Sequence, residues 1–480
     1  MNAGAAIGDR LGREEAVLAA RAGLATRQGA WIVGGALRDA LLSTAPIADL
    51  DLVVSGPDAG EAARSVARAA GVPAFPLSEQ FGAWRVVGKS WLCDITPMQG
   101  GGIEADLAQR DFTVNAMALP LFGGTLVDPH HGVRDLDARV LRLVAPGAYE
   151  RDRLRPLRLV RFATELGFEV EPATAAATRE WAAHIPDAAG ERIFAELRRI
   201  VVAPRVAHGL GLASELGVLA AVLPELDALH GIEQSHFHHL DVYDHTVEVL
   251  NSLIAIDTEL ADWFPADAQA LRGVLDEPLG DELTRAQALR FAALFHDIGK
   301  AATRDFTDTG RVTFIGHDAV GADMVRGICR RLRTSERFRE FLAQITRHHL
   351  VLGFLVHERP LSRRAVYRYL KRCSPVEVEV TMLTCADRVA TRGRNADVAI
   401  EAHLGLAREL MTAALAWRAE GPPRPPLPGN ELADELGIQP GPDLGRLLAE
   451  IEEASYAGEV TNADQAVEYA RRLRENQART

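Results

Sequence analysis

Two acidic residues, Asp49 and Asp51, stand one residue apart in the apolar segment ADLDLVV. Alternate side chains of a β-strand point to the same side, so a strand here would present both carboxylates together and bury Leu50. Such a pair can hold Mg²⁺, and two hard cations bridged by carboxylates and phosphate oxygens can activate a hydroxyl for in-line displacement. The spacing therefore favours metal-assisted chemistry on a phosphate.

A glycine pair lies upstream of these acids, directly after the apolar segment WIV. A turn at Gly34 and Gly35 would let the backbone approach a triphosphate closely, and Arg38 would add positive charge beside it. Each motif also has an ordinary reading, as a strand-to-helix turn and as a solvated strand end. In this order the two motifs predict a nucleoside triphosphate site.

Further polar residues follow in apolar surroundings. Asp94, in WLCDIT, could be a third carboxylate on a neighbouring strand, or a buried structural acid held by hydrogen bonds. The segment RDFTVNAMA adds Arg110, Asp111 and Asn115, which near a triphosphate could bind ribose hydroxyls or phosphate oxygens. Helix capping and turn stabilisation explain the same three residues equally well.

Asp152, Arg155 and Arg158 are spaced by three, which on a helix places Asp152 and Arg155 on one face with Arg158 close by. Cytosine and adenine both present an amino donor beside a ring-nitrogen acceptor. A fixed Asp/Arg pair could therefore select these two bases and reject uracil and guanine. The alternative is an intrahelical salt bridge worth less than ~1 kcal/mol, and these residues alone favour it.

A second group of residues with metal-ligand chemistry lies in the histidine-rich segment 230–357, which holds ten of the fifteen histidines. The candidate ligands in this segment are, in order, His245, His296, Asp297, His317 and His348, and Asp387 follows the segment. Imidazole and carboxylate groups on separate helices can converge on one or two divalent metals, and a metal-bound water of lowered pKa can attack a phosphate ester. A lone histidine on an apolar helix is usually a core residue, but this ordered set predicts a metal site, either catalytic or structural.

The composition is that of an ordinary soluble protein, with 480 residues and a formal net charge of −13. This length predicts three or four domains. No apolar run reaches the roughly 18 to 20 residues that cross a bilayer, and the N-terminus lacks a hydrophobic signal core, so we expect a cytoplasmic protein. The acidic charge disfavours nonspecific coating of nucleic acid, although arginine-rich stretches at 151–161, 329–339 and 362–372 could contact phosphates.

The pattern of the chain changes near residue 148. Strand-like and helical segments alternate before it, and apolar residues recur at helical spacing almost everywhere after it. This predicts an α+β protein with a small α/β head and an all-α body. The predicted divisions are an N-terminal helix (1–30), the head (31–145), a helical neck (146–228), a histidine-rich helical domain (229–400) and a linker with a helical tail (401–480).

Several ordered motifs resemble those of the bacterial tRNA nucleotidyltransferase and poly(A) polymerase family, class II of the polymerase-β-like nucleotidyltransferases. The matching segments are GGALRD with DLD, RDFTVNAMA, RDRLRPLRLVRFATELGF and, in the tail, LADELGIQPGPDLGRLLAEIEEASYAGEVTNADQAVEYA. The resemblance implies transfer of C and A from CTP and ATP to the 3′ end of tRNA, with Asp49, Asp51 and Asp94 holding two Mg²⁺ ions. It implies nucleotide contacts by Gly34, Gly35, Arg38, Arg110, Asp111, Asn115, Asp152, Arg155 and Arg158.

The histidine-rich segment resembles the HD phosphohydrolase superfamily. Its H...HD...D ligand pattern is matched by His245, His296, Asp297 and Asp387, and His317 with His348 would fit a second metal. The resemblance implies metal-dependent hydrolysis of a phosphate ester, with the metal and the ester left open.

The exact product of the head also stays open. The loop ITPMQGGGIEA, between Asp94 and Asp106, is shorter than in family members that complete CCA alone, which favours CC addition. A-adding enzymes and poly(A) polymerases share the same motifs. A rival of another class is an HD phosphohydrolase whose head only binds a regulatory nucleotide.

Overall fold

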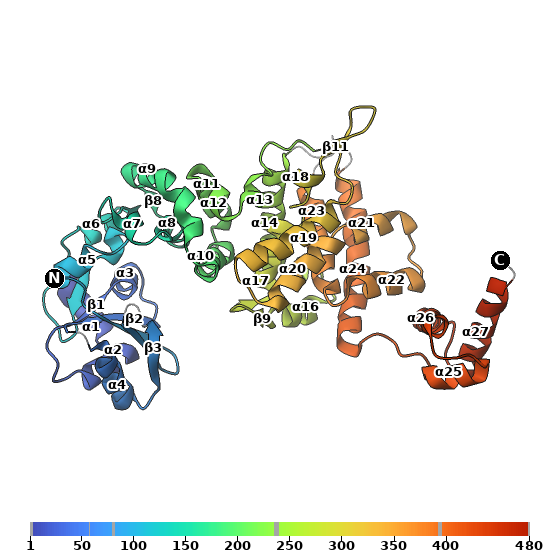
Figure 1. Ribbon diagram of the computed structural model, residues 1–480, viewed down its shortest axis with the longest axis horizontal. Coiled ribbons are helices and arrows are strands. Elements are labelled where there is room, and N and C mark those ends of the chain that lie inside the picture. Colours follow the sequence, from blue (N-terminus) through green and yellow to red (C-terminus); the bar gives the residue numbers. More distant parts are fainter. Residues whose placement is uncertain (1–2, 57, 79–81, 235–239, 392–395, 479–480) are drawn as a thin grey trace. The chain divides into compact units, whose positions relative to one another are not determined.

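The computed structural model describes residues 3–56, 58–78, 82–234, 240–391 and 396–478 (Figure 1). The chain divides into two compact units, Met1–Val222 and Leu223–Thr480. None of the helices in the described ranges is long and apolar enough to cross a membrane.

The first unit begins with a six-stranded sheet in the order β3-β4-β5-β2-β1-β6. The strands are β1 (Ala30–Val33), β2 (Asp49–Val54), β3 (Ala74–Ser78), β4 (Ala83–Val87), β5 (Leu92–Pro97) and β6 (Ala118–Pro120). Only the central pair, β2 and β5, runs parallel; the other neighbours are antiparallel. A separate parallel pair joins β7 (Val140–Leu141) to β8 (Glu169–Val170).

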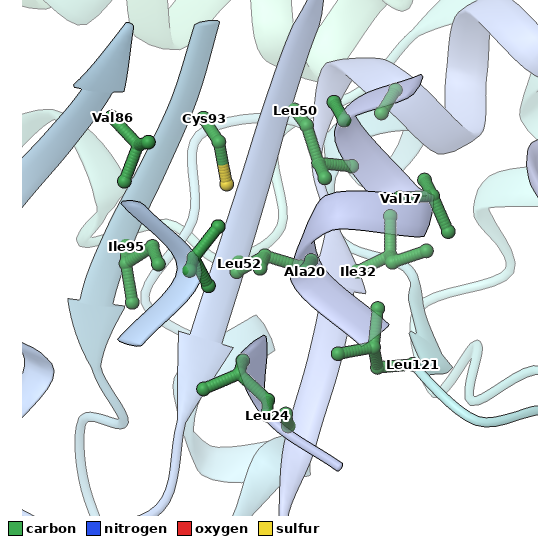
Figure 2. Packing of buried hydrophobic residues seen from close by; sticks show 14 of the residues in the cluster. Val17, Ala20, Leu24, Ile32, Leu50, Leu52, Val86, Cys93, Ile95 and Leu121 are labelled. Atoms are coloured by element: carbon green, nitrogen blue, oxygen red, sulfur yellow. The ribbon is translucent and has the colours of Figure 1, made fainter. Parts of the chain in front are cut away.

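Helices cover one face of the six-stranded sheet. They are α1 (Ala3–Leu11), α2 (Glu15–Gly23), α3 (Gly35–Leu42) and α4 (Ala59–Ala70). Their apolar side chains pack with Leu50 and Leu52 of β2 and with Cys93 and Ile95 of β5 (Figure 2). The single helix expected over 1–30 is two helices, because the chain turns at Gly12 and Arg13 between them. Because the hydrophobic core fills this face of the sheet, the polar side chains of β2 must act from the opposite face.

The rest of the first unit is helical, apart from short pieces at the sheet. Its helices are α5 (Ile103–Leu107), α6 (Gly132–Asp137), α7 (Ala148–Arg151), α8 (Arg155–Leu166), α9 (Pro172–Trp181), α10 (Gly190–Val202), α11 (Val206–Glu215) and α12 (Val218–Val222). Helix α8 packs against α10 and α11 and also contacts the short strand β7. The predicted change from an α/β head to a helical body is confirmed.

The second unit is almost entirely helical. Its helices are α13 (Pro224–Asp227), α14 (Val242–Thr258), α15 (Leu260–Trp263), α16 (Ala268–Leu275), α17 (Arg285–Phe295), α18 (Lys300–Thr303), α19 (His317–Arg331), α20 (Glu336–His348), α21 (Val351–Leu355), α22 (Arg363–Cys373), α23 (Glu377–Ala390), α24 (Ala396–Glu420), α25 (Gly429–Leu436), α26 (Pro442–Ala457) and α27 (Ala463–Ala478). Two short hairpins join β9 (Pro278–Gly280) to β10 (Leu283–Thr284) and β11 (Asp305–Phe306) to β12 (Val312–Thr313). Helix α24 runs unbroken across the predicted boundary at residue 400.

The arginine-rich stretch 362–372 forms α22, and its charges face the tail of the same unit. Arg364 contacts Glu459 at 2.7 Å, Glu453 at 3.3 Å and the hydroxyl of Tyr469 at 2.8 Å. Arg368 reaches Glu453 at 2.7 Å. These arginines therefore hold α26 and its neighbours rather than presenting a free row of charges to phosphate.

Arg364→Ala should loosen the tail, because it removes charge-assisted hydrogen bonds to three partners. We expect protease cleavage in the segment 421–428 to accelerate by about tenfold, the effect of losing one such hydrogen bond. Arg372→Ala, an exposed position on the same helix, is the matched control and should leave the cleavage rate unchanged. Equal rates for both variants would show that this contact does not hold the tail.

Candidate functional site

Strand β2 places the two acids of the first motif on the open face of the sheet. Asp49 and Asp51 are both exposed, whereas Leu50 between them is buried in the covered face, as predicted. Asp51 stands opposite Val33 of β1 and Asp94 of β5 in the strand register. Three carboxylates therefore come from the central parallel pair.

The glycine pair forms the turn between β1 and α3. Gly34 has a positive φ of 70°, and α3 begins at Gly35. A Cβ atom on Gly34 would lie 3.1 Å from Oδ2 of Asp51 and 3.1 Å from Nη1 of Arg110. The turn thus brings the backbone directly against the acids, which only glycine allows.

Gly34→Ala should damage the site without changing its charge. The backbone conformation at this position would cost about 1–3 kcal/mol with alanine, and the added methyl group would push on Asp51 and Arg110. We expect kcat/KM for nucleotide incorporation to fall by about tenfold or more. Gly211→Ala, in helix α11, where the Cβ would meet no atom within 4 Å, is the control. Unchanged kinetics in Gly34→Ala would contradict a role for this turn.

A cavity of about 430 Å³ opens over the two acids. Its lining consists of Gly34, Gly35, Arg38, Asp39, Asp49, Asp51, Arg110, Asp111, Asn115, Asp152, Arg155, Arg158, Arg161, Phe162 and Arg199. Every nucleotide-site residue predicted for the head lines this cavity, with the exception of Asp94. Six arginines among five aspartates make it a place where a triphosphate and cations could be held together.

A chain of hydrogen bonds crosses the cavity wall. Nη1 of Arg38 donates to Oδ1 of Asn115 at 2.7 Å, and Nδ2 of Asn115 donates to Oδ1 of Asp111 at 3.1 Å. Arg158 donates to Oδ2 of Asp111 through Nε at 2.9 Å and Nη2 at 2.7 Å. Burial alone would raise the pKa of Asp111, but Arg158 and these hydrogen bonds hold it well below its ordinary value. Asp111 and Asn115 of the predicted trio thus join Arg38 and Arg158 in one charged wall, whereas Arg110 pairs with Asp106 at 3.3 Å.

The carboxylate of Asp51 is electrostatically crowded. Desolvation by the surrounding protein raises its pKa, and the neighbouring Asp94 and Asp49 add to the rise, while Arg110 opposes it. A divalent cation between these acids would relieve the repulsion. The residues therefore fit a metal ion.

Asp94 has a different partner. Both of its carboxylate oxygens accept hydrogen bonds at 2.8 Å from Arg85, one from Nε and one from Nη2. The strand register puts Asp94 next to Asp51, yet its side chain does not line the cavity. Its role as a third metal ligand stays a prediction that the geometry does not favour.

Asp152 and Arg155 do not share a helix as the spacing suggested. Helix α7 ends at Arg151, Asp152 is extended with φ −147°, and α8 begins at Arg155 with a proline in its first turn. Arg155 instead donates to backbone oxygens of Gln109, Arg110 and Ala148, and Asp152 pairs with Arg192 at 2.9 Å. Both side chains still line the cavity, so they reach it from separate elements.

In the second unit, helix ends bring the predicted metal ligands together. The ligand-bearing positions are His245 in α14, His296 and Asp297 directly after α17, His317 at the start of α19, His349 directly after α20 and Asp387 in the last turns of α23. All except Asp387 are buried. Helix ends fix such side chains because the helices pack against one another around them.

Asp297 is the centre of this cluster. Its Oδ2 lies 3.2 Å from Nε2 of His296 and 3.8 Å from Nε2 of His245. Its Oδ1 lies 3.3 Å from Nε2 of His317 and 3.7 Å from Nε2 of His349. The ligand atoms form two groups of three that share Asp297, with all atoms of each group within 4.8 Å of one another. This arrangement could hold two cations bridged by one carboxylate.

The histidine rings are oriented for metal binding. In His296, His317 and His349, Nδ1 lies 2.7–2.8 Å from the backbone carbonyl oxygen three residues earlier. A hydrogen bond donated from Nδ1 leaves the lone pair of Nε2 free, as in metal-ligating histidines. Nε2 of His296 is buried and has no hydrogen-bond partner among the described residues. This orphaned nitrogen, aimed at Asp297, fits a metal ligand.

Asp387 is the last residue of the cluster, and the ionisation of Asp297 and His349 suits metal binding. Oδ1 of Asp387 lies 3.1 Å from Nε2 of His245. Although burial would raise the pKa of Asp297, His296 and Lys300 hold it well below its ordinary value, so this carboxylate is ionised. Burial also lowers the pKa of His349, which keeps that ring neutral and able to bind.

One predicted ligand, His348, lies outside both ligand groups, and the adjacent His349 lies inside one of them. His348, the last residue of α20, lies in neither group, whereas His349 lies in the second. Successive residues of a helix point about 100° apart, so only one of two adjacent histidines can face Asp297. His348 instead lies near Arg372, and burial lowers its pKa to about 4. We therefore propose His349 in place of His348 as the ligand of this group.

Comparison with known proteins decides the family. Residues 96–142 match the model of the poly(A) polymerase head domain, residues 167–229 match the "probable RNA and SrmB-binding site of polymerase A", and residues 242–391 match the HD domain. The chain is 37% identical to the A-adding tRNA nucleotidyltransferase of Deinococcus radiodurans over 93% of this chain and 96% of that relative. It belongs to the tRNA nucleotidyltransferase and poly(A) polymerase family.

Two further matches extend this result. The CC-adding tRNA nucleotidyltransferase of Thermus thermophilus is 35% identical over 92% of this chain and 93% of that relative. The crystal structure of the Bacillus stearothermophilus CCA-adding enzyme in complex with CTP has the same fold, with a TM-score of 0.63, 22% identity, and coverage of 97% of this chain and 98% of that one. This nucleotidyltransferase thus combines the predicted head and HD domains in one chain.

Sequence reasoning missed some cavity residues of this nucleotidyltransferase. Phe162 is surrounded by three guanidinium groups, at 5.1 Å for Arg38, 5.5 Å for Arg158 and 3.8 Å for Arg161. Arg161 is buried and pairs with Glu196 of α10. The run RPLRLVRF carried the signal, since its arginines recur at three-residue intervals on one face of α8.

Proposed function

We propose that this chain adds C residues, A residues or both to the 3′-terminal CCA sequence of tRNA, using CTP, ATP or both and releasing pyrophosphate. The observation that carries the proposal is the cavity over Asp49 and Asp51, which collects two exposed acids, a glycine turn and six arginines in one place. The names of the relatives supply the acceptor, since the Deinococcus and Thermus proteins are A-adding and CC-adding tRNA nucleotidyltransferases.

Asp49 and Asp51 would hold Mg²⁺ in this reaction. Bound there, the ions would lower the pKa of the attacking 3′ hydroxyl and stabilise the leaving pyrophosphate. Gly34 brings backbone N–H groups close to the phosphates, and Arg38 and Arg110 offset their negative charge. The hydrogen bond to Asn115 keeps Arg38 in position before the nucleotide binds, and the ion pair with Asp106 does the same for Arg110.

Selection of C and A would fall to Asp152 and Arg155. Both line the cavity, and Arg192 and three backbone carbonyls fix their side chains. A carboxylate acceptor and a guanidinium donor, fixed separately, match the amino group and ring nitrogen that cytosine and adenine share. Uracil and guanine would leave these groups unpaired, which costs about 1–3 kcal/mol per group.

The test supplies purified protein with tRNA lacking its 3′ CCA, Mg²⁺ and each of the four nucleoside triphosphates in turn, and measures label incorporation and pyrophosphate release. Incorporation of C or A together with stoichiometric pyrophosphate, and background levels with UTP and GTP, is the expected result. Equal use of all four nucleotides would contradict the proposed selection by Asp152 and Arg155.

A second activity is supported by the two ligand groups that share Asp297. We infer that the HD domain hydrolyses a phosphate ester with one or two divalent metals bound by His245, His296, Asp297, His317, His349 and Asp387. The test is hydrolysis of bis-p-nitrophenyl phosphate and p-nitrophenyl phosphate after dialysis against Mn²⁺, Ni²⁺ or Zn²⁺. Metal retention without turnover of either ester would mean a structural metal and would overturn the activity.

A further inference from the structure

The HD unit contains a pocket, open to solvent on one side, that neither activity uses. This cavity of about 410 Å³ is lined by Leu279, Arg285, Arg337, Glu340, Phe341, Gln344, Pro375, Val376 and Arg418. Its volume lies in the range of small-molecule sites, about 300–1,000 Å³. We propose that it binds a small organic phosphate of mononucleotide size.

The cavity lies away from the metal cluster. Arg285 is the first residue of α17, and His296 follows the last one, so about 16 Å of helix separates them. Val376 directly precedes α23, and Asp387 lies about as far along that helix. A ligand here would not touch the metal ligands, so the cavity is a separate site on the same helices.

Positive charge converges on the cavity from three elements. Arg285 comes from α17, Arg337 from α20 and Arg418 from α24, so three guanidinium groups can close on one anion. The amino ends of α17 and α23 also meet there, and helix amino ends favour anions. Guanidinium forks match phosphate oxygens with paired hydrogen bonds.

Acids engage two of these three arginines. Arg285 pairs with Glu379, Arg418 pairs with Glu277, and the acid in the lining, Glu340, is bound by Arg326 at 3.1 Å and by Arg339 at 3.4 Å. Arg337 is exposed and forms no ion pair with any residue that the structure describes. Arg337, at the edge of the lining, is therefore the guanidinium that remains for an anion to bind.

Part of the lining is apolar and lies beside Arg285. Leu279, Phe341 and Val376 are buried, and the guanidinium of Arg285 lies 5.2 Å from the centre of the Phe341 ring. An inorganic anion bound to the arginines would make no contact with these apolar side chains. A planar organic group carrying a phosphate would cover the ring and reach the arginines, which is why we assign an organic phosphate rather than inorganic phosphate.

The test is photo-cross-linking of the full-length protein with 2-azido-AMP, followed by peptide mass mapping. Mapping separates the two units, so labelling of the head cavity does not interfere. We expect cross-links in peptides that contain 336–344 or 375–379. Arg337→Ala and Gln344→Trp, which remove a charge and fill the space, should each lower that yield by about tenfold. Arg330→Ala, at an exposed arginine outside the cavity, should leave it unchanged.

Competition identifies the chemistry of the ligand. AMP should suppress the cross-link at concentrations about tenfold lower than adenosine or inorganic phosphate, because only AMP carries both the planar base and the phosphate. Adenosine or phosphate competing as well as AMP would overturn the assignment. So would an absence of cross-links in these peptides, or a yield that Arg337→Ala and Gln344→Trp leave unchanged.

Discussion

Replacing Asp49 and Asp51 together by asparagine should lower nucleotide incorporation by about 10³-fold or more, which corresponds to about 4 kcal/mol of lost transition-state stabilisation. The two side chains lie on one face of β2 and line the cavity with the glycine turn. Asparagine keeps their shape and removes the charge that would hold Mg²⁺. The measurement is single-turnover extension of tRNA at saturating CTP.

Asp58→Asn is the matched control for this pair. Asp58 is exposed in the same unit and caps α4 by accepting a hydrogen bond from the backbone of Glu61, which asparagine can also do. Extension should be unchanged in this variant, and hydrolysis by the HD domain should be unchanged in all of them. If the Asp49/Asp51 double variant still extends tRNA at the normal rate, the cavity is not the catalytic site.

Replacing His296 by glutamine should remove metal from the HD domain. Its Nε2 lies 3.2 Å from the carboxylate of Asp297, which the two ligand groups share, is buried, and has no hydrogen-bond partner in the described part of the chain. Loss even of groups that only support a metal ligand lowers metal affinity by about 10–100-fold, so loss of a direct ligand should cost at least about 100-fold. Asp297→Asn should weaken both groups, since they share it.

Substitutions at His348 and His349 distinguish the ligand assignment made from the sequence, His348, from the one made from the geometry, His349. His348→Gln should keep the metal content of the unaltered protein, whereas His349→Gln should lower it, as measured by elemental mass spectrometry after dialysis. tRNA extension should be normal in every one of these variants. Loss of metal in His348→Gln alone would restore the original ligand assignment from the sequence and contradict the geometry.

The sequence predicted local features well where a single periodicity, such as the two-residue repeat of a β-strand, determines which way side chains point. The alternation DLDLVV on β2 placed two acids on one face and the leucines on the other, and the model has this arrangement. The order of histidines and aspartates along the chain predicted most residues of the cluster around Asp297 but not His349, because the distances that join them arise from helices far apart in sequence.

The failures have physical causes at particular residues. Spacing by three put Asp152 and Arg155 on one helix, but the chain is extended at Asp152 and a proline opens α8, so the helical geometry did not apply. The choice between His348 and His349 depends on the rotation of α20 at its end. The partners of Arg364 lie 89 to 105 residues away, and no local pattern reveals such contacts.

The central claim is nucleotide addition to the 3′ end of tRNA, and one measurement tests it most directly. Three tRNAs, ending before CCA, after the first C and after CC, would be incubated with Mg²⁺ and CTP, ATP or both, and the products resolved to single nucleotides. We predict stepwise addition that stops at or before the terminal A, and the short loop at residues 95–105 favours a stop after CC. Failure to extend any of the three ends would contradict the account.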